Sequence, residues 1–287
     1  MDQVNFSKWH GIGNDYIIIA AQDLDFTMTP ARARAICDRN FGIGADGILL
    51  WSGTESGRFR LDIFNPDGSV AEMCGNGIRM LASYLSKNGL AREETIAVET
   101  KAGIIASTVL VDGNVRVHMG QARLGGLHDN GYAGAGGGGE TGRLMITAAG
   151  RELTTTFVDM GNPHCVIEVD DLENIDMQRL GPAIENHEIF PNRANVEFMQ
   201  IMGPREVKMR VWERGVGETN ACGTGACAVA VAAYRLRGAG SPTTVHLPGG
   251  DLLIEVEPGM DVYMTGSAED IYTGAMSEDF VVKLKGL

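Results

Sequence analysis

Two short segments of the sequence combine a cysteine with closely spaced glycines. Cys74-Gly75-Asn76-Gly77 and Cys222-Gly223-Thr224-Gly225 share the pattern Cys-Gly-x-Gly, and 222 − 74 = 148 positions separate them, about half of the 287-residue chain. Each segment precedes an apolar run that predicts a helix, 78–85 and 226–236. This repeat indicates two similar domains, each with one thiol at a helix start. Two thiols that face one carbon from opposite sides can remove a proton from one face and return a proton to the other, which is the chemistry of a racemase or epimerase.

A helix start also favours a bound anion. Its first backbone N–H groups lack partners within the helix and carry partial positive charge. The glycines beside Asn76 and Thr224 allow a ligand to approach the backbone, so both turns are predicted to bind a carboxylate. The same field can lower the pKa of a cysteine. The simpler alternative is that each cysteine is a small buried residue and each glycine a turn residue.

The residues upstream of the two cysteines also correspond. Asn65 stands nine positions before Cys74, and Glu213 stands nine positions before Cys222, each at the end of a predicted strand. The Asn65 amide suits the charged ends of an amino acid, and Arg214 offers a fork for a carboxylate. The ordinary alternatives are a turn residue for Asn65 and a surface charge for Arg214.

Gly161-Asn162-Pro163 forms a rigid turn after a predicted strand and precedes His164. From that turn the imidazole could be directed at a thiol and help to set its ionisation. A purely structural histidine is the alternative.

The elements that must position these residues follow an α+β pattern, with strands, a cysteine-initiated helix and more strands in each half. Helices are predicted over 30–40, with Thr29 as N-cap, and from Cys74 to Asn88-Gly89. Predicted strands of the first half are 16–20, 47–51, 59–64, 95–98, 104–111 and 115–119. Those of the second half are 153–159, 165–169, 196–202, 207–212, 244–246, 252–256 and 261–265. The run 134–139, almost all glycine, is predicted to be a flexible linker.

Composition excludes several classes of protein. A formal net charge of −13 argues against nucleic acid and anionic membranes as partners. The five scattered cysteines predict reduced thiols, and the spacing of Cys222 and Cys227 does not suit zinc. No long apolar run or basic leader precedes the first strands, so a cytoplasmic protein is expected. The segment 42–47 fits G-x-G-x-x-G, but it follows a predicted helix and precedes a strand, the reverse of the order in a dinucleotide site.

Taken together, these segments resemble the diaminopimelate epimerase family over nearly the whole chain. The resemblance is strongest in 213–219, Glu-Arg-Gly-Val-Gly-Glu-Thr, which runs into Ala221-Cys222-Gly223-Thr224-Gly225. It extends to Lys8–Asp15, 42–47, 64–68, Met73–Gly77, 161–164 and Asn195-Val196.

The resemblance implies an α+β fold of two pseudo-symmetric, barrel-like, β-rich domains, each wrapped around a central helix, with the active site in the cleft between them. The implied domains are 1–121 with 268–287, which carries Cys74, and 122–267, which carries Cys222. It further implies a homodimer, a diaminopimelate substrate, and no metal or organic cofactor. The glycine-rich linker would permit closure of the cleft.

The resemblance also assigns roles to individual residues. Cys74 and Cys222 would be the acid–base pair, assisted by His164 and Glu213. The reacting α-carboxylate would bind the backbone of Gly75, Asn76, Gly223 and Thr224, and the distal amino acid end would bind Asn14, Asn65, Asn162, Asn195 and Arg214. Some relatives have a side-chain donor at the position of Gly47, so that contact is not expected here.

Three other functions fit parts of the sequence. Racemases of proline or hydroxyproline tend to have a histidine at the position of Asn76 and need no distal clamp, which disfavours them. An epimerase for histidine or a similar amino acid stays open. A small-anion binding protein without catalysis would not need both thiols.

Overall fold

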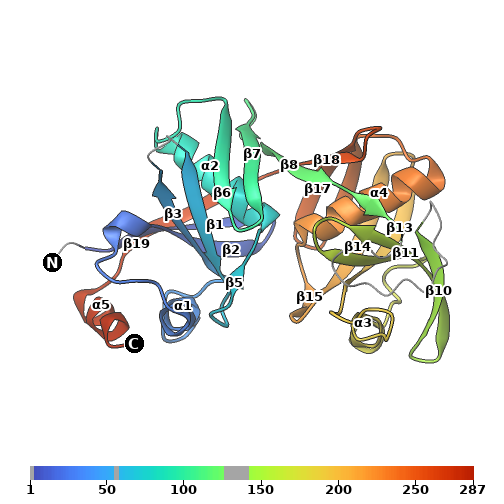
Figure 1. Cartoon of the computed structure of the whole chain (residues 1–287), viewed down its shortest axis with the longest axis horizontal. Coiled ribbons are helices and arrows are strands. Elements are labelled where there is room, and N and C mark those ends of the chain that lie inside the picture. Colours follow the sequence, from blue (N-terminus) through green and yellow to red (C-terminus); the bar gives the residue numbers. More distant parts are fainter. Residues whose placement is uncertain (1–2, 55–57, 126–141) are drawn as a thin grey trace. The chain divides into compact units, whose positions relative to one another are not determined.

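The computed structural model describes residues 3–54, 58–125 and 142–287. It divides into two compact units, Met1–Val117 with Gly266–Leu287 and His118–Thr265 (Figure 1). These boundaries lie within a few residues of those expected from the sequence. That the two units act as functional domains stays a prediction. The glycine-rich run 134–139 lies outside the described residues. Within the described ranges, no helix is long and apolar enough to cross a membrane.

The first unit is built on one mixed sheet. β2 pairs parallel with β3, and β4 pairs parallel with β6, whereas the other neighbours are antiparallel. In spatial order its strands are β19 (Glu269–Ala275), β1 (Asn5–Gly11), β2 (Asn14–Ala20), β3 (Ile48–Gly53), β4 (Phe59–Phe64), β6 (Thr95–Thr100), β7 (Gly103–Val109) and the first residues of β8 (Val115–Gln121). After Val117, β8 belongs to the second unit. The short β5 (Val70–Ala71) pairs with the end of β4.

Helix α2 (Gly75–Lys87) is the core of this unit. It contacts β1 and β2 near one end of the strand order and β7 near the other, so the sheet curls around it. Helices α1 (Pro30–Cys37) and α5 (Glu278–Lys285) pack against the opposite face of the sheet, in a cluster that includes Ile17 and Ile19 of β2. The short η1 (Ala21–Asp23) follows β2.

Helix α1 begins as predicted, because Thr29 Oγ1 accepts the N–H of Arg32, but it is shorter than the predicted 30–40. Asp38 leaves the helical conformation, and its carboxylate accepts the N–H groups of Asn40 and Phe41. This side chain therefore replaces the next helical turn with a local turn.

The second unit repeats the design. Its strands, in spatial order, are β10 (Arg143–Ala148), β11 (Arg151–Asp159), β12 (Pro163–Glu168), β13 (Asn195–Gly203), β14 (Glu206–Glu213), β16 (Thr243–Leu247), β17 (Gly250–Val256) and β18 (Asp261–Gly266). β12–β13 and β14–β16 are parallel, while β9 (Arg123–Leu124) and β15 (Gly217–Thr219) add short pairings. Helix α4 (Gly223–Arg237) packs against six of these strands, and α3 (Met177–Glu185) packs outside β13 and β14.

The two units share strand order and register. In the first unit, Ile48 pairs with Ile17 on one side and with Phe64 on the other. In the second unit, Val196 pairs with Cys165 and with Trp212, and each of these residues stands 148 positions after its counterpart. The internal duplication predicted from the two cysteines is confirmed, as is the α+β class. The structure adds β1, β19, β10, α3 and α5, which the sequence patterns did not predict.

The contact between α3 and β14 gives a first prediction. Gly181 of α3 lies against the Trp212 ring, and a Cβ built on Gly181 would lie 2.4 Å from Trp212 Cδ2. Gly181→Ala is therefore expected to destabilise the protein by about 1–3 kcal/mol, although alanine is the better helix former. Thermal unfolding measures the effect, with Gly53→Ala as control because no atom lies within 4 Å of a Cβ there. Equal melting temperatures for the two variants would contradict this packing.

Candidate active site

The two predicted cysteines occupy equivalent positions in the structure. Cys74 is the N-cap of α2, with φ −142° and ψ 112°. Cys222 is the N-cap of α4, with φ −131° and ψ 108°. Gly75 and Gly223 are the first residues of the two helices, so the backbone predicted to bind carboxylate lies at a helix start in both units.

Cys74 lies beside hydrogen-bond donors of its own unit. Its Sγ is 3.4 Å from the backbone nitrogen of Gly77 and 3.6 Å from the Tyr16 hydroxyl oxygen. Both groups can donate to a thiolate. Tyr16, in β2, was not singled out by the sequence analysis, because a tyrosine in an apolar strand reads as a core residue.

Cys222 lies in a more buried and more acidic environment. Burial raises the pKa of the Cys222 thiol well above its usual value, and the carboxyls of Glu213 and Glu197 raise it further. The lowering of a cysteine pKa that a helix start can cause is therefore outweighed at Cys222. Desolvation and two nearby carboxyls outweigh the partial charge of the helix terminus, so this thiol keeps its proton.

Glu213, the last residue of β14, is hydrogen-bonded to the Cys222 thiol. Burial raises the pKa of the Glu213 carboxyl, and hydrogen bonds from Thr219 and Cys222 oppose that rise. A carboxyl with a raised pKa is a stronger base than an ordinary glutamate, and its hydrogen bond with the Cys222 thiol places it to accept the thiol proton.

The duplication extends to side-chain hydrogen bonds. Asn76 Nδ2 donates to Asn14 Oδ1 over 3.1 Å in the first unit. In the second unit, Asn162 Nδ2 donates to Thr224 Oγ1 over 3.4 Å. Asn162 stands 148 positions after Asn14, and Thr224 stands 148 positions after Asn76. Each cysteine-initiated helix is thus joined through its second residue to the asparagine at the start of the neighbouring strand.

A network of charged side chains holds the side chain of Asn14 in place. Asn14 Nδ2 donates to Asp46 Oδ2 over 3.0 Å, and Arg39 bridges Asp46 and Asp15 with two contacts of 2.7 Å. Burial raises the pKa of Asp15, but hydrogen bonds from Arg39 and Lys8 lower it to about 2. Asp15 is therefore ionised at neutral pH, and the network holds the Asn14 amide in one orientation.

The predicted residues of the second unit are joined by short contacts. His164 Nε2 lies 3.1 Å from Asn162 Oδ1, and its Nδ1 lies 2.6 Å from Glu197 Oε1. Asn195 Nδ2 donates to the Pro163 carbonyl, and Asn195 Oδ1 accepts the Arg214 N–H over 2.9 Å. Asn195 thus hydrogen-bonds both to the turn that precedes His164 and to the turn that contains Arg214.

Arg214 and Asn65 are less buried than His164 and Asn195. Arg214 is exposed, and its Nη1 donates to the Asn192 carbonyl over a long 3.4 Å. Asn65 Nδ2 donates to Ser69 Oγ within the turn that follows β4. The contacts described for Asn65 do not join it to the other predicted site residues of its unit.

Gly47 has no space for a side chain. A Cβ there would lie 2.4 Å from Tyr16 Cε1 and 2.7 Å from the Phe64 carbonyl oxygen. The Tyr16 ring therefore occupies the volume beside Gly47, which explains in physical terms why no donor side chain stands at this position.

Two buried glutamates were missed by the sequence analysis. Glu197, in β13, has a fully buried side chain beside His164. Glu185, in α3, accepts hydrogen bonds from the Gly215 N–H and from Trp212 Nε1, which anchors the turn that carries Arg214. The available signal for Glu197 was an acidic residue at an inward position of an otherwise apolar strand.

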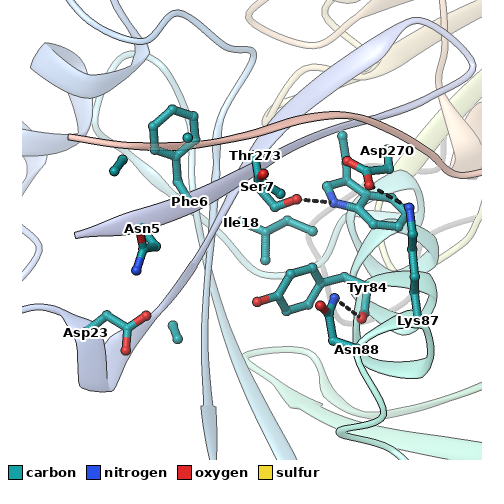
Figure 2. A pocket seen from close by; sticks show the side chains of 14 residues that line it. Asn5, Phe6, Ser7, Ile18, Asp23, Tyr84, Lys87, Asn88, Asp270 and Thr273 are labelled. Carbon is teal, nitrogen blue, oxygen red and sulfur yellow. Dashed lines mark hydrogen bonds and ion pairs between the residues drawn. The ribbon is translucent and has the colours of Figure 1, made fainter. Parts of the chain in front are cut away.

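A pocket of about 520 Å³ in the first unit contains none of the predicted site residues. Figure 2 shows Asp23, Tyr84, Asn88 and the Lys87–Asp270 ion pair around it. It lies at the C-terminal end of α2, whereas Cys74 stands at the N-terminal end, about 20 Å away along the helix axis. Among the residues described, no cluster of three or more His, Cys, Asp or Glu side chains could hold a metal ion.

Comparison with known proteins shows the family of this chain. The family model described as diaminopimelate epimerase matches residues 6–125 and 156–271. The diaminopimelate epimerase of Pelotomaculum thermopropionicum is 45% identical over 280 residues, with 94% of this chain and 98% of the relative covered. The diaminopimelate epimerase of Synechocystis sp. is 44% identical over 275 residues, again with 94% and 98% covered.

Solved structures of lower identity share the fold. A hydroxyproline epimerase from Agrobacterium vitis has a TM-score of 0.70 at 13% identity, over 97% of this chain and 93% of its own. A phenazine biosynthesis protein of the PhzF family from Bacillus anthracis has a TM-score of 0.70 at 16% identity, over 96% and 100%. The family model matches most of the sequence, and the two relatives cover 94% of it at 44–45% identity, so this chain belongs to the diaminopimelate epimerase family.

Proposed function

We propose that this protein interconverts LL- and meso-diaminopimelate by inverting one α-carbon, a step in the synthesis of lysine and of peptidoglycan precursors. The observation that carries the proposal is the pair of cysteine N-caps, Cys74 and Cys222, at equivalent places in duplicated units of a diaminopimelate epimerase family member. One thiol for each face of the carbon is what a two-base inversion requires.

In the proposed reaction, a thiolate removes the α-proton and the opposite thiol delivers a proton to the resulting carbanion. Cys222 is the protonated partner at rest, because its surroundings hold the proton on sulphur. For the reverse direction, Glu213 accepts the Cys222 proton, so that the thiolate can act as the base. We propose that His164 also assists thiol ionisation, which requires its Nε2 to exchange the contact with Asn162.

The α-proton of an amino acid is only weakly acidic, so the carbanion needs stabilisation. We propose that the reacting carboxylate lies against both helix starts, at Gly75-Asn76 and Gly223-Thr224. Backbone N–H groups and partial positive charge there oppose the negative charge that develops in the transition state.

The distal amino acid end gives the proposed specificity. We propose that Asn14, Asn65, Asn162, Asn195 and Arg214 bind this end. Arg214 is exposed and has a guanidinium fork suited to a carboxylate, while Asn14 is held rigidly by Asp46. Asn195 contributes by fixing the Arg214 backbone. A substrate with two amino acid ends suits this arrangement, whereas proline has only one.

A direct assay tests the substrate. LL-Diaminopimelate should be converted to the meso form, with L-proline and L-histidine left unchanged under the same conditions. Faster racemisation of proline or histidine would identify that amino acid as the substrate in place of diaminopimelate. The proposed two-thiol chemistry would be unaffected by that result.

We further propose a homodimer in the cytoplasm. All five cysteines are free, as in a reducing compartment. For the dimer, β19 is paired with β1 on one side, and its Ile271 and Tyr272 side chains are about half exposed. An edge strand that exposes large apolar side chains suits a protein interface.

The dimer has its own test. Light scattering should give twice the chain mass, and Tyr272→Asp should shift the population to the monomer because the charge would be buried at the interface. Glu257→Gln, a change at an exposed position of the second unit, serves as the control. A monomeric unchanged chain would contradict the proposal.

A further inference from the structure

A buried histidine–glutamate pair lies beneath one cysteine helix and has no counterpart beneath the other. The side chains of His164 and Glu197 are both fully buried, with Nδ1 and Oε1 2.6 Å apart. The residues 148 positions earlier are Tyr16 and Leu49, and they hold the same places in the register of β2 and β3. The duplication therefore places a carboxyl in the second unit where the first unit has an aliphatic side chain.

This carboxyl lies against the first turn of α4. A Cβ built on Gly225 would lie 2.9 Å from Glu197 Oε1 and 3.2 Å from Cys222 Sγ. At the equivalent Gly77 of α2, the same construction meets Leu49 Cδ2 at 2.9 Å and Cys74 Sγ at 3.7 Å. The site beneath each thiol is thus the same in shape and different in chemistry.

Glu197 also begins a chain of hydrogen bonds that ends at the thiol. Asn162 Nδ2 donates to Thr224 Oγ1, so the amide oxygen of Asn162 faces His164 and must accept from Nε2. Thr224 Oγ1 then lies 3.7 Å from Cys222 Sγ. With Nε2 protonated, Nδ1 and Glu197 Oε1 share a further proton between them, which fixes the imidazole ring at both nitrogens.

The second carboxyl oxygen of Glu197 is buried at an energetic cost. Within the described part of the chain, the buried Oε2 has no hydrogen-bond partner. An unsatisfied buried carboxyl oxygen is unfavourable, whereas a leucine, as at position 49, would avoid that cost. A group kept in the core at such a cost suggests a role other than packing.

We propose that Glu197 is a positioning residue of the Cys222 half of the site: it orients His164, and through it Asn162 and Thr224, and it keeps the proton on the Cys222 sulphur. The proposal rests on the proposed acid–base roles of the two thiols. It makes the thiols unequal, because Cys74 has Leu49 and the Tyr16 hydroxyl in the places where Cys222 has the Glu197–His164 pair. Among the described residues, the ionisable groups that interact with Glu197 include His164, Cys165, Glu213 and Cys222.

Two variants separate orientation from charge. Glu197→Gln keeps an oxygen that can accept from His164 Nδ1 but removes the negative charge, and Glu197→Leu copies the residue of the first unit and removes both. Thiolate absorbance is followed against pH in each variant, and the signal of a matched chain that also carries Cys222→Ala is subtracted. Glu168→Gln, in the exposed Glu168–Arg237 pair, is the control for a change of charge in the same unit.

Glu197→Gln is expected to form the Cys222 thiolate at a pH lower by about one unit or more than the unchanged chain, because the proton on His164 Nδ1 is then left without the carboxylate that balances its charge. Glu197→Leu is expected to raise KM for LL-diaminopimelate about tenfold, the effect of losing one well-oriented hydrogen bond, while Glu197→Gln leaves KM close to its original value.

An unchanged thiolate midpoint in Glu197→Gln would overturn the proposal, and so would an unchanged KM in Glu197→Leu. If Glu197→Leu does not fold, the midpoint in Glu197→Gln decides the outcome. The absorbance titration needs no substrate, so it is interpretable even if diaminopimelate is not turned over. Failure of the proposed function is thereby distinguished from failure of the role of Glu197.

Discussion

Replacing either Cys74 or Cys222 by alanine is expected to lower kcat/KM for epimerisation by about a thousandfold, the scale of losing a general acid or base. Each cysteine caps the start of a buried helix, and neither fills the middle of the core. The loss should therefore come without a comparable loss of stability. Conversion of LL- to meso-diaminopimelate, measured in both directions, reports the effect.

The control for these variants lies in the same helix as Cys222. Cys227 is fully buried in α4, one turn after the cap, and has no proposed part in catalysis. Cys227→Ala should retain activity and lose about 1 kcal/mol of stability, because a small apolar group leaves the core. Activity of Cys74→Ala or Cys222→Ala within tenfold of the unchanged chain would contradict the two-thiol account.

Glu213→Gln is expected to lower kcat/KM by about a hundredfold and to change the pH profile. Burial raises the pKa of Glu213, so its ionised form is lost at a higher pH than for an ordinary glutamate as the solution is acidified. Activity that depends on this carboxylate should thus fall on the acid side of the profile. In Glu213→Gln that acid limb should disappear, since the amide does not titrate.

Glu218→Gln is the matched control for Glu213→Gln. Glu218 is in the adjacent β15, is exposed, and pairs with Arg210 at the surface. Removing its charge should leave both rate and pH profile unchanged, because an exposed ion pair contributes little. An acid limb that persists in Glu213→Gln would show that another group takes the Cys222 proton.

Sequence patterns could predict the duplicated framework because local signals mark it. A cysteine followed by alternating glycines and an apolar run specifies a helix start, and both helices begin where predicted. Most strands with runs of β-branched residues were also predicted. The separation of 148 positions, noticed for the cysteines alone, holds for the paired residues of β2, β3 and β4 as well.

Other elements could not be predicted because their local signals are weak or misleading. β19 is an edge strand with nearly every residue exposed, so it lacks the alternation that marks a half-buried strand. α3 contains Gly181-Pro182, which reads as a helix breaker, and tertiary packing on Trp212 overrides that signal. β1 mixes lysine, histidine and asparagine with aromatic residues, and its buried Lys8 is held by Asp15 and Gly44.

The candidate site, like the fold, was only partly predictable from the sequence. The residue types and their places were predictable, but the environment of each thiol was not, because it depends on side chains brought from distant strands. The helix start alone predicts a more acidic cysteine, whereas burial, together with Glu213 and Glu197, raises the pKa of the Cys222 thiol. Glu197 carries no local signal except its charge, so only the three-dimensional register places it beside the thiol.

Solvent-hydrogen exchange in deuterated water tests the central claim, inversion by two thiols, most directly. Meso-diaminopimelate formed from LL-diaminopimelate at low conversion should carry one deuterium at the inverted α-carbon and none at the other, while the recovered substrate stays unlabelled. This result is expected because the proton that is delivered comes from the opposite thiol, which exchanges with solvent. Product without deuterium, or equal labelling of product and recovered substrate at low conversion, would contradict the two-base account.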